Sequence, residues 1–327
     1  MLIRRVLSRL KRMVVGTKTA PNQPPTIVDA VPAPSASQAV VESPGNLSVG
    51  EYWTRHNVTL HHAFASREES LDYFWWRCDQ YFSYIDLMPV SGCDGQVVLD
   101  FGCGPGHDLV GFGTYSKPAR LYGYELSSSS LREARARLAL HGIDAELIQG
   151  DADRPTLPLA TGSVDFIHSS GVLHHVPDID ACLQELRRIL KQDGRMQVMV
   201  YNQDSIWYHL YVAYQWRLVW GKDAALPLKD AFARSTDGED CPIANVYAPA
   251  EFIQICARNG FEATYRGAAV SMHEAGLAPL RFPAIQDRRM PVESRKFLLG
   301  LEFDSRGLPL HNGKYAGIDA CFELRKK

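Results

Sequence analysis

The chain has 327 residues, of which 46% are hydrophobic and 22% are charged, and its formal net charge is −2 at pH 7. Such a composition predicts a globular protein with a sizeable core, in one elaborated domain or two modest ones. The near-neutral charge argues against a general nucleic-acid binder, which would carry a basic surface. No apolar run approaches the ~20 residues that cross a bilayer as a helix.

The seven cysteines are scattered along the chain. Their number is odd, none forms a C-x-x-C pair, and no Cys/His spacing matches a zinc site. We therefore expect reduced thiols in a cytoplasmic protein and assign no metal.

The first 18 residues contain basic side chains but no acidic one. On a helical projection most of the apolar residues fall on one arc of about 140°, with most of the basic residues on the other side. This pattern predicts an amphipathic helix on an anionic surface, such as the inner face of a membrane. A solvated tail and a mitochondrial presequence are the alternatives.

The next segment, residues 19–48, is rich in Pro, Ala and Ser and lacks aromatic residues, so we expect a disordered linker. Residues 49–93 are rich in aromatic side chains and predict a helical cap, with order beginning near Gly50. Most of these aromatic residues are expected to serve as packing.

From residue 96 onward, short apolar runs alternate with helical segments, which indicates a parallel α/β sheet. The predicted strands are 97–101, 121–126, 145–150, 164–170, 196–201, 261–267 and 316–324. The predicted helices begin at residues 108 and 128 and cover 180–191, 205–220 and 249–259. Residues of about 203–245 and 271–315 are interpreted as insertions into a domain that spans 94–327.

The first predicted strand runs into a glycine-rich turn, Asp100-Phe-Gly-Cys-Gly-Pro-Gly106. Such a turn lets the backbone approach a nucleotide-like ligand without clashes from Cβ atoms. A dinucleotide fingerprint starting at Gly102 would need a glycine where His107 stands. Asp100 suits a ligand with a positive amino group, as in S-adenosylmethionine, because a carboxylate would repel a pyrophosphate.

Two further acids follow predicted strands. Glu125 ends the second strand, where a carboxylate can accept the ribose hydroxyls of an adenosine. Asp151 follows the third strand, where it can accept from an adenine amino group. Separately, Glu125 could be a solvated strand end and Asp151 a helix N-cap. Because Asp100, Glu125 and Asp151 lie at the ends of successive strands of one predicted sheet, the sequence favours the interpretation that all three line one ligand site.

The segments DFGCGPG, YELS, GDA, SSGVLHHVPD and LRRILKQDGRMQVMVY resemble the successive motifs of the class I methyltransferases, above all those that act on small molecules. The resemblance covers residues 96–201. It implies a Rossmann-like sheet of seven strands with the last strand antiparallel, and S-adenosylmethionine as the cofactor. Together with the segments described above, the expected fold is such a sheet with helices on both faces, an N-terminal helical cap and a C-terminal insertion. The resemblance further implies that the cofactor contacts Asp100, Gly102, Gly104, Gly106, Glu125, Leu126, Asp151, Ala152 and Ser169.

Residues 201–216 and 237–252 are also similar to methyltransferases of bacterial surface-polysaccharide and other glycan gene sets. The leading hypothesis is therefore methyl transfer to an oxygen of a small-molecule or glycan acceptor. A lipid-linked or quinone-like acceptor is the second hypothesis, and a non-catalytic cofactor-binding protein is the third. A nucleic-acid acceptor is disfavoured because Ser-Ser-Gly-Val stands where such enzymes carry an N/D-P-P-Y/F tetrapeptide.

A hydroxyl acceptor needs a general base. His175, and with less support His174, follows the fourth predicted strand at the ligand-binding edge of the sheet. The alternative is that one histidine packs beneath the cofactor while the other faces solvent. The acceptor pocket is expected to draw on the polar residues Tyr201, Asn202, His209, Asp237, Glu239, Asp240 and His273.

Overall fold

The computed structural model of the chain describes residues 47–59, 61–151 and 156–327. The predicted helix at 1–18, nearly all of the predicted linker and Ala152 lie outside the described residues. In the described part of the chain, no helix has both the length and the apolar character needed to cross a membrane. All seven cysteines carry free thiols, and only Cys241 is not fully buried.

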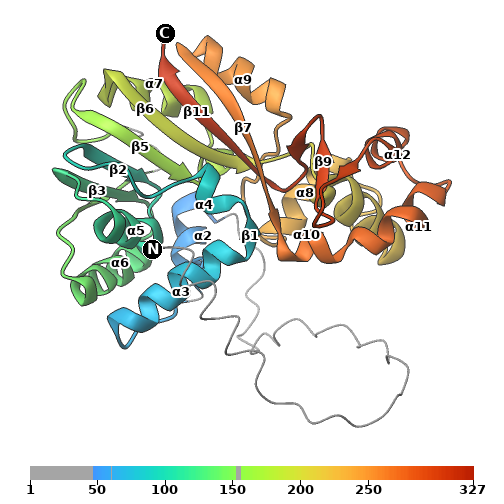
Figure 1. The fold of residues 1–327 in the computed structure, drawn as a ribbon, viewed down its shortest axis with the longest axis horizontal. Helices are drawn as coiled ribbons and strands as arrows, with labels where there is room; N and C mark the ends of the chain where they lie inside the picture. Colours follow the sequence, from blue (N-terminus) through green and yellow to red (C-terminus); the bar gives the residue numbers. More distant parts are fainter. Residues whose placement is uncertain (1–46, 60, 152–155) are drawn as a thin grey trace. The chain divides into compact units, whose positions relative to one another are not determined.

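One large mixed sheet dominates the described residues (Figure 1). Its strand order is β1-β7-β11-β6-β5-β2-β3-β4. The strands of this sheet are β1 Tyr81–Phe82, β2 Val97–Phe101, β3 Arg120–Glu125, β4 Glu146–Gln149, β5 Val164–Ser170, β6 Leu190–Tyr201, β7 Phe261–Ser271 and β11 Asp319–Lys326. Strands β2 to β6 pair in parallel, and β11 is antiparallel to both of its neighbours, β6 and β7.

The predicted Rossmann-like α/β sheet with an antiparallel last strand is confirmed, with one addition. The two-residue strand β1 pairs with the outer edge of β7, Tyr81 opposite Ser271, and makes an eighth strand. Residues 81 and 82 were predicted to lie inside the helical cap, because two residues are too few to show the alternation that marks a strand.

Helices cover both faces of the sheet. The helices of the described residues are α2 Val49–Arg55, α3 Arg67–Asp79, α4 Tyr84–Leu87, α5 His107–Tyr115, α6 Ser128–His141, η1 Leu173–His175, α7 Ile179–Ile189, η2 Trp207–Val219, α8 Leu228–Thr236, α9 Pro249–Arg258, α10 Met272–Gly276, η3 Ala278–Leu280, α11 Arg281–Gln286 and α12 Val292–Leu299. Helix α7 ends before the predicted end at residue 191. The buried Leu190 instead pairs with Val164 and starts β6, so the sheet extends the strand backwards through Gly194.

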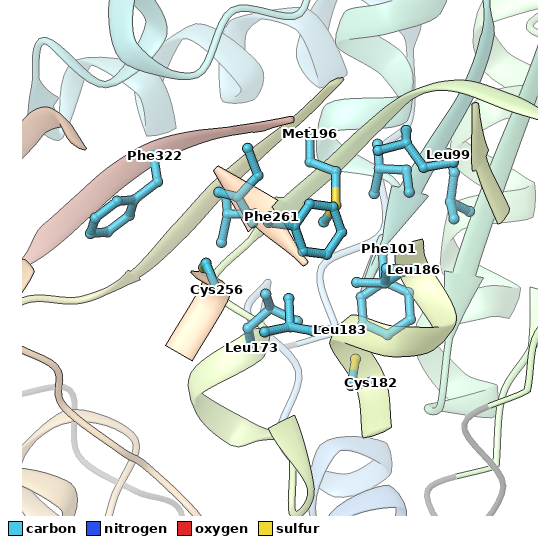
Figure 2. Packing of buried hydrophobic residues seen from close by; sticks show 14 of the residues in the cluster. Leu99, Phe101, Leu173, Cys182, Leu183, Leu186, Met196, Cys256, Phe261 and Phe322 are labelled. Atoms are coloured by element: carbon cyan, nitrogen blue, oxygen red, sulfur yellow. The ribbon is translucent and has the colours of Figure 1, made fainter. Parts of the chain in front are cut away.

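Strand residues alternate between two apolar cores because successive side chains point to opposite faces. Leu99 and Ile167 belong to the core beneath α7 and α9, whereas Val98 and Phe166 belong to the core beneath α3 to α6. Figure 2 shows the first core, where Leu183 and Leu186 of α7 pack among Leu99, Phe101, Met196, Phe261 and Phe322 from the strands. With apolar layers on both sides, the sheet is a fixed support for the loops at its carboxyl edge.

The segments interpreted as insertions gather at one end of the sheet, beside β7 (Figure 1). The first contains η2, a π-helix in which the N–H of Trp220 bonds to the C=O of Gln215, five residues earlier. The second contains α10 to α12 and a small antiparallel sheet of β8 Glu302–Phe303, β9 Pro309–His311 and β10 Lys314–Tyr315. Both segments share a third apolar core.

Buried Glu274 of α10 joins these segments to the main sheet. Its carboxylate accepts hydrogen bonds from the N–H of Trp207 at 3.0 Å, the N–H of Ile318 at 3.2 Å, and both the N–H and the hydroxyl of Ser271 at 2.9 Å. The start of η2, the end of β7 and the residue before β11 therefore meet at one side chain.

Candidate cofactor and acceptor site

The glycine-rich turn between β2 and α5 is held in a conformation that favours glycine. Gly102, Gly104 and Gly106 all have positive φ angles, of 81°, 50° and 78°. A Cβ on Gly102 would lie 2.2 Å from Cγ2 of Val172, so no larger residue fits there. A Cβ on Gly104 would meet nothing within 4 Å, and the backbone of this residue borders an open cavity.

Glu125 at the end of β3 is tied to the same turn. One carboxylate oxygen accepts from the N–H of Gly104 at 3.0 Å and the other from the N–H of Ser127 at 2.8 Å. Burial raises the pKa of Glu125, and these backbone hydrogen bonds oppose the rise. Each oxygen keeps a second lone pair, so the carboxylate can still accept from hydroxyl groups of a ligand.

A cavity of about 1100 Å³, counted with the solvent at its mouth, lies at the carboxyl edge of the sheet. Of the residues predicted from the sequence, it is lined by Gly102, Gly104, Glu125, Leu126, Asp151 and His175. A neighbouring hollow shares Leu126 and Asp151 with it. The predicted residues Asp100, Gly106, Ser169 and His174 are not in the lining.

Asp100 and Ser169 lie just beneath the cavity. Asp100 is 2% exposed, its Oδ2 has no hydrogen-bond partner within the described residues, and burial raises its pKa to about 7. Ser169 is fully buried, and it is Ser170 that lines the cavity and shares a 2.6 Å hydrogen bond with the hydroxyl of Tyr84. Neighbouring strand residues face opposite ways, so Ser169 and Ser170 lie on different faces of the sheet.

The two histidines after β5 have different surroundings. His174 is fully buried, stacks on Tyr201 with ring centroids 3.7 Å apart, and accepts at Nδ1 from the N–H of Tyr201 at 3.2 Å. Burial holds its pKa well below the usual range. His175 lines the cavity and packs edge-on against Trp53, with centroids 4.8 Å apart. Only His175 can therefore touch a ligand in this cavity.

The proton on His175 can be located from its neighbours. Nδ1 lies 2.5 Å from the C=O of Ile243, which can only accept, so Nδ1 carries the hydrogen and Nε2 carries the lone pair. Nε2 lies 3.7 Å from Oδ2 of Asp237, which is too far for a hydrogen bond. Burial lowers the pKa of His175, while the charge of Asp237 opposes this shift.

Asp237 is held in place by two tyrosines from distant segments. The hydroxyl of Tyr201 donates to both carboxylate oxygens, at 3.0 and 2.9 Å, and the hydroxyl of Tyr52 on α2 donates to the backbone C=O of Asp237. His175, Asp237 and Cys241 place potential metal ligands within 4.8 Å of one another. The thiol of Cys241 bonds to the same Ile243 carbonyl as His175, so protein hydrogen bonds already account for this cluster.

The remaining residues proposed for the acceptor pocket serve other contacts. Asn202 donates to the backbone at Asp204 and Gly317, and His209 bonds to Ser294 and stacks on Phe297. Glu239 pairs with Arg234, and His273 packs against Trp207. Neither these four residues nor Asp240 is in the cavity lining.

The lining also contains residues that were not predicted as site residues, among them Trp53, Asn57, Arg77 and Asp108. The first three belong to the N-terminal cap, where aromatic and helical patterns indicated only packing. Asp108 lies two residues beyond the last glycine of the turn, and this short spacing is the sequence signal from which it could have been predicted as a site residue.

The loop after α2 is fastened to α6 by a single carboxylate. Glu133 accepts from Nδ2 of Asn57 at 2.6 Å and the hydroxyl of Thr59 at 3.3 Å, and its other oxygen lies 2.7 Å from Nδ1 of His61. The hydroxyl of Ser129 also donates to the C=O of Thr54 at 2.8 Å. These contacts hold Asn57 at the cavity wall.

Comparison with known proteins agrees with this geometry. Residues 99–198 match the family model described as methyltransferase domain. An uncharacterized 37.1 kDa protein in transposon TN4556 of Streptomyces fradiae is 37% identical over 127 residues, covering 38% of this chain and 36% of that protein. Methyltransferase GfsG of Streptomyces halstedii is 25% identical over 180 residues, covering 50% of this chain and 62% of that protein.

The matches to these two curated relatives thus span between 36% and 62% of the relatives' own length. Among solved structures, the YcgJ protein of Bacillus subtilis aligns with a TM-score of 0.47 and 16% identity, covering 73% of this chain and 96% of that chain.

The residues present suit the cofactor that such a domain uses. Hydrogen-bond acceptors for an adenosine joined to an amino acid are provided by the carboxylate of Glu125 and by the buried oxygen of Asp100, which has no partner within the described residues. The open space beside Gly104 lets such a ligand approach the backbone. With the matched family model, these features place a methyltransferase domain within residues 99–198, beside a cavity whose residues suit S-adenosylmethionine.

Proposed function

We propose that the chain transfers a methyl group to an oxygen of a small-molecule or glycan acceptor, with His175 as the general base. The observation that carries this proposal is that the glycine turn, Glu125 and His175 border one cavity. The proposed cofactor site and an imidazole with a free nitrogen would therefore share one cavity.

The cofactor-binding residues fall into three groups. The backbone at Gly102 and Gly104, with Asp100 beneath it, would hold the methionine part. Glu125 and Leu126 would flank the ribose, and Asp151 would lie at the adenine. When bound, S-adenosylmethionine supplies an electrophilic methyl group on a sulfonium, so much of the acceleration depends on positioning and on exclusion of water.

His175 would accept the proton of the acceptor at Nε2. The bond from Nδ1 to Ile243 fixes the tautomer, and Trp53 packs against the ring, so the imidazole has one orientation. Its lowered pKa keeps it neutral, and hence basic, at neutral pH. His174 is assigned a structural role, because its ring is enclosed by Tyr201 and does not reach the cavity.

The test measures cofactor binding and methyl transfer separately, on the full chain. Calorimetric titration with S-adenosylhomocysteine should give a micromolar dissociation constant, about −8 kcal/mol. Labelled S-adenosylmethionine is then incubated with two acceptor pools from the host cell, a water-soluble extract and a lipid extract. We expect the label in the water-soluble pool.

His175→Ala should lower the transfer rate by about 10²- to 10⁴-fold, the usual contribution of a general base, and leave the binding of S-adenosylhomocysteine within a few-fold of the wild type. His62→Ala, at an exposed histidine outside the cavity lining, is the matched control. Label in the lipid pool alone would replace the acceptor class with a lipid-linked or quinone-like one. Tight binding without transfer to either pool would favour a non-catalytic cofactor-binding protein.

A further inference from the structure

An unpaired cation borders the cofactor cavity. Arg77 of α3 is the sole Arg or Lys among the described lining residues. Within the described part of the chain its guanidinium has no hydrogen bond and no ion pair. A half-buried guanidinium left without a partner is costly, which points to a ligand group as the missing partner.

Two carboxylates near Arg77 also have unused acceptors. Asp108 lines the cavity at 7% exposure; its Oδ2 accepts from Nε2 of His168 at 3.1 Å, and its Oδ1 has no partner within the described residues. Oδ2 of Asp100 is likewise unpartnered. Arg77 is close enough to lower the pKa of both carboxyls, yet it forms an ion pair with neither.

This arrangement complements a zwitterion. Arg77 and the free oxygen of Asp108 border the same cavity beside the glycine turn, and the buried Asp100 is a second carboxylate with an unused oxygen. These charges match the carboxylate and the ammonium of an amino acid. A guanidinium can hold a carboxylate through two parallel hydrogen bonds. The charge of Asp108 acts on Arg77, and Asp108 lies in the first turn of α5, directly after the glycine turn. Arg77 therefore lies at the glycine-turn end of the cavity.

We propose that Arg77 binds the carboxylate at the amino-acid end of the cofactor. The ammonium of the same end would donate hydrogen bonds to Asp108 and Asp100. This inference rests on the proposed function, because it assumes that S-adenosylmethionine occupies the cavity. It assigns the cap helix α3 a direct part in cofactor binding, outside the segment that matches the methyltransferase family at 99–198.

The test compares two ligands that differ in the amino-acid end. S-adenosylhomocysteine carries the carboxylate and the ammonium, whereas methylthioadenosine keeps the adenosine and the sulfur but lacks both. Dissociation constants are measured by calorimetry for the wild type, Arg77→Met, Arg77→Lys and the control Arg135→Met, at an exposed arginine of α6. Methionine keeps much of the apolar stem and removes the charge.

Arg77→Met should weaken S-adenosylhomocysteine by about 10- to 100-fold, the range for a charged hydrogen bond. Methylthioadenosine should bind within two-fold of the wild type, Arg77→Lys should recover part of the loss, and Arg135→Met should change neither ligand. Equal weakening of both ligands would show a structural role and overturn the proposal. Unchanged S-adenosylhomocysteine would assign Arg77 to an acidic acceptor instead. If the wild type binds neither ligand, the proposed function itself has failed.

Discussion

The proposed cofactor half and the proposed acceptor half of the site are built differently. At the cofactor end, Glu125 is held by backbone N–H groups of Gly104 and Ser127, on the loops that follow adjacent strands. At the acceptor end, Asp237 is held by the side chains of Tyr201 and Tyr52, which lie 36 and 185 residues away in the chain. Backbone geometry governs the first half and side-chain contacts between distant segments govern the second. Changes in the two halves should therefore have different effects.

The largest effect on stability and on cofactor binding is expected from a substitution that strains the backbone of the glycine turn. Gly102→Ala would place a Cβ 2.2 Å from Val172 in a left-handed conformation. Backbone strain and overlap together should lower the free energy of unfolding by about 2–4 kcal/mol and abolish binding of S-adenosylhomocysteine. Urea denaturation measures the first quantity and calorimetry the second.

Gly162→Ala is the matched control, because Gly162 has a φ of 64° but a Cβ there would meet nothing within 4 Å. It should lose only the strain component, about 1–2 kcal/mol, and keep cofactor binding. Equal losses of stability in the two variants would mean that the contact with Val172 does not constrain the turn.

A smaller and purely kinetic effect is expected in the acceptor half. Asp237→Asn removes the charge 3.7 Å from Nε2 of His175 but can still accept from the hydroxyl of Tyr201. The methyl-transfer rate should fall by about 10- to 100-fold, while binding of S-adenosylhomocysteine and stability stay near the wild type.

The pH dependence gives a second readout for Asp237. Burial lowers the pKa of His175 and Asp237 raises it, so the acid limb of kcat/KM lies below the ordinary histidine pKa of about 6.5. Without the charge at residue 237 this limb should move to still lower pH. Asp240→Asn, at an exposed acid of the same loop, should leave the limb in place. A limb that moves equally in both variants would argue for a general effect of loop charge.

The smallest effect is expected where the cap meets the core. Glu133→Gln weakens the contacts of the loop bearing Asn57 and should reduce the affinity for S-adenosylhomocysteine by a few-fold, since partly exposed pairs contribute about 0.2–1 kcal/mol. Glu68→Gln, at an exposed acid of α3, should not change this affinity.

The same loop should respond to pH through His61. The hydrogen bond to Glu133 raises the pKa of His61, so the pairing stabilises the loop fully below the ordinary pKa of about 6.5 and is lost as pH rises through the raised pKa. Cofactor affinity in the wild type should fall over that range. An identical fall in Glu133→Gln would assign the pH dependence to another group.

These differences also explain what could be predicted from the sequence. Strands β2 and β5 were predicted at their observed bounds, because each is a short segment that begins with apolar residues and is bounded by glycines, Gly95 and Gly102 for β2 and Gly162 and Gly171 for β5. The cofactor residues follow those strands at short spacing. Arg77, by contrast, reaches the cavity only through tertiary packing of the cap, and no local pattern distinguishes it from a surface arginine.

The same limit applies to the acceptor half. Residues 205–220 were predicted as a helix, but its π form depends on how the segment packs within the third core, and helical periodicity does not distinguish the two forms. The pairing of His175 with Asp237 crosses 62 residues and two structural segments. It depends on the path of the loop after α8, for which the sequence offers few turn or helix signals.

The contacts of Glu274 have a consequence for how proteins of this architecture can diversify. Because one side chain anchors the stem of each added segment to the ends of β7 and β11, the residues farther out can lengthen, shorten or change composition without altering the stems. Related chains with other acceptors would then keep an acid at this place while the helices between Gly276 and Pro309 diverge. The range of acceptors could then change while the hydrogen bonds of Glu274 are retained, independently of the methyl-donor site.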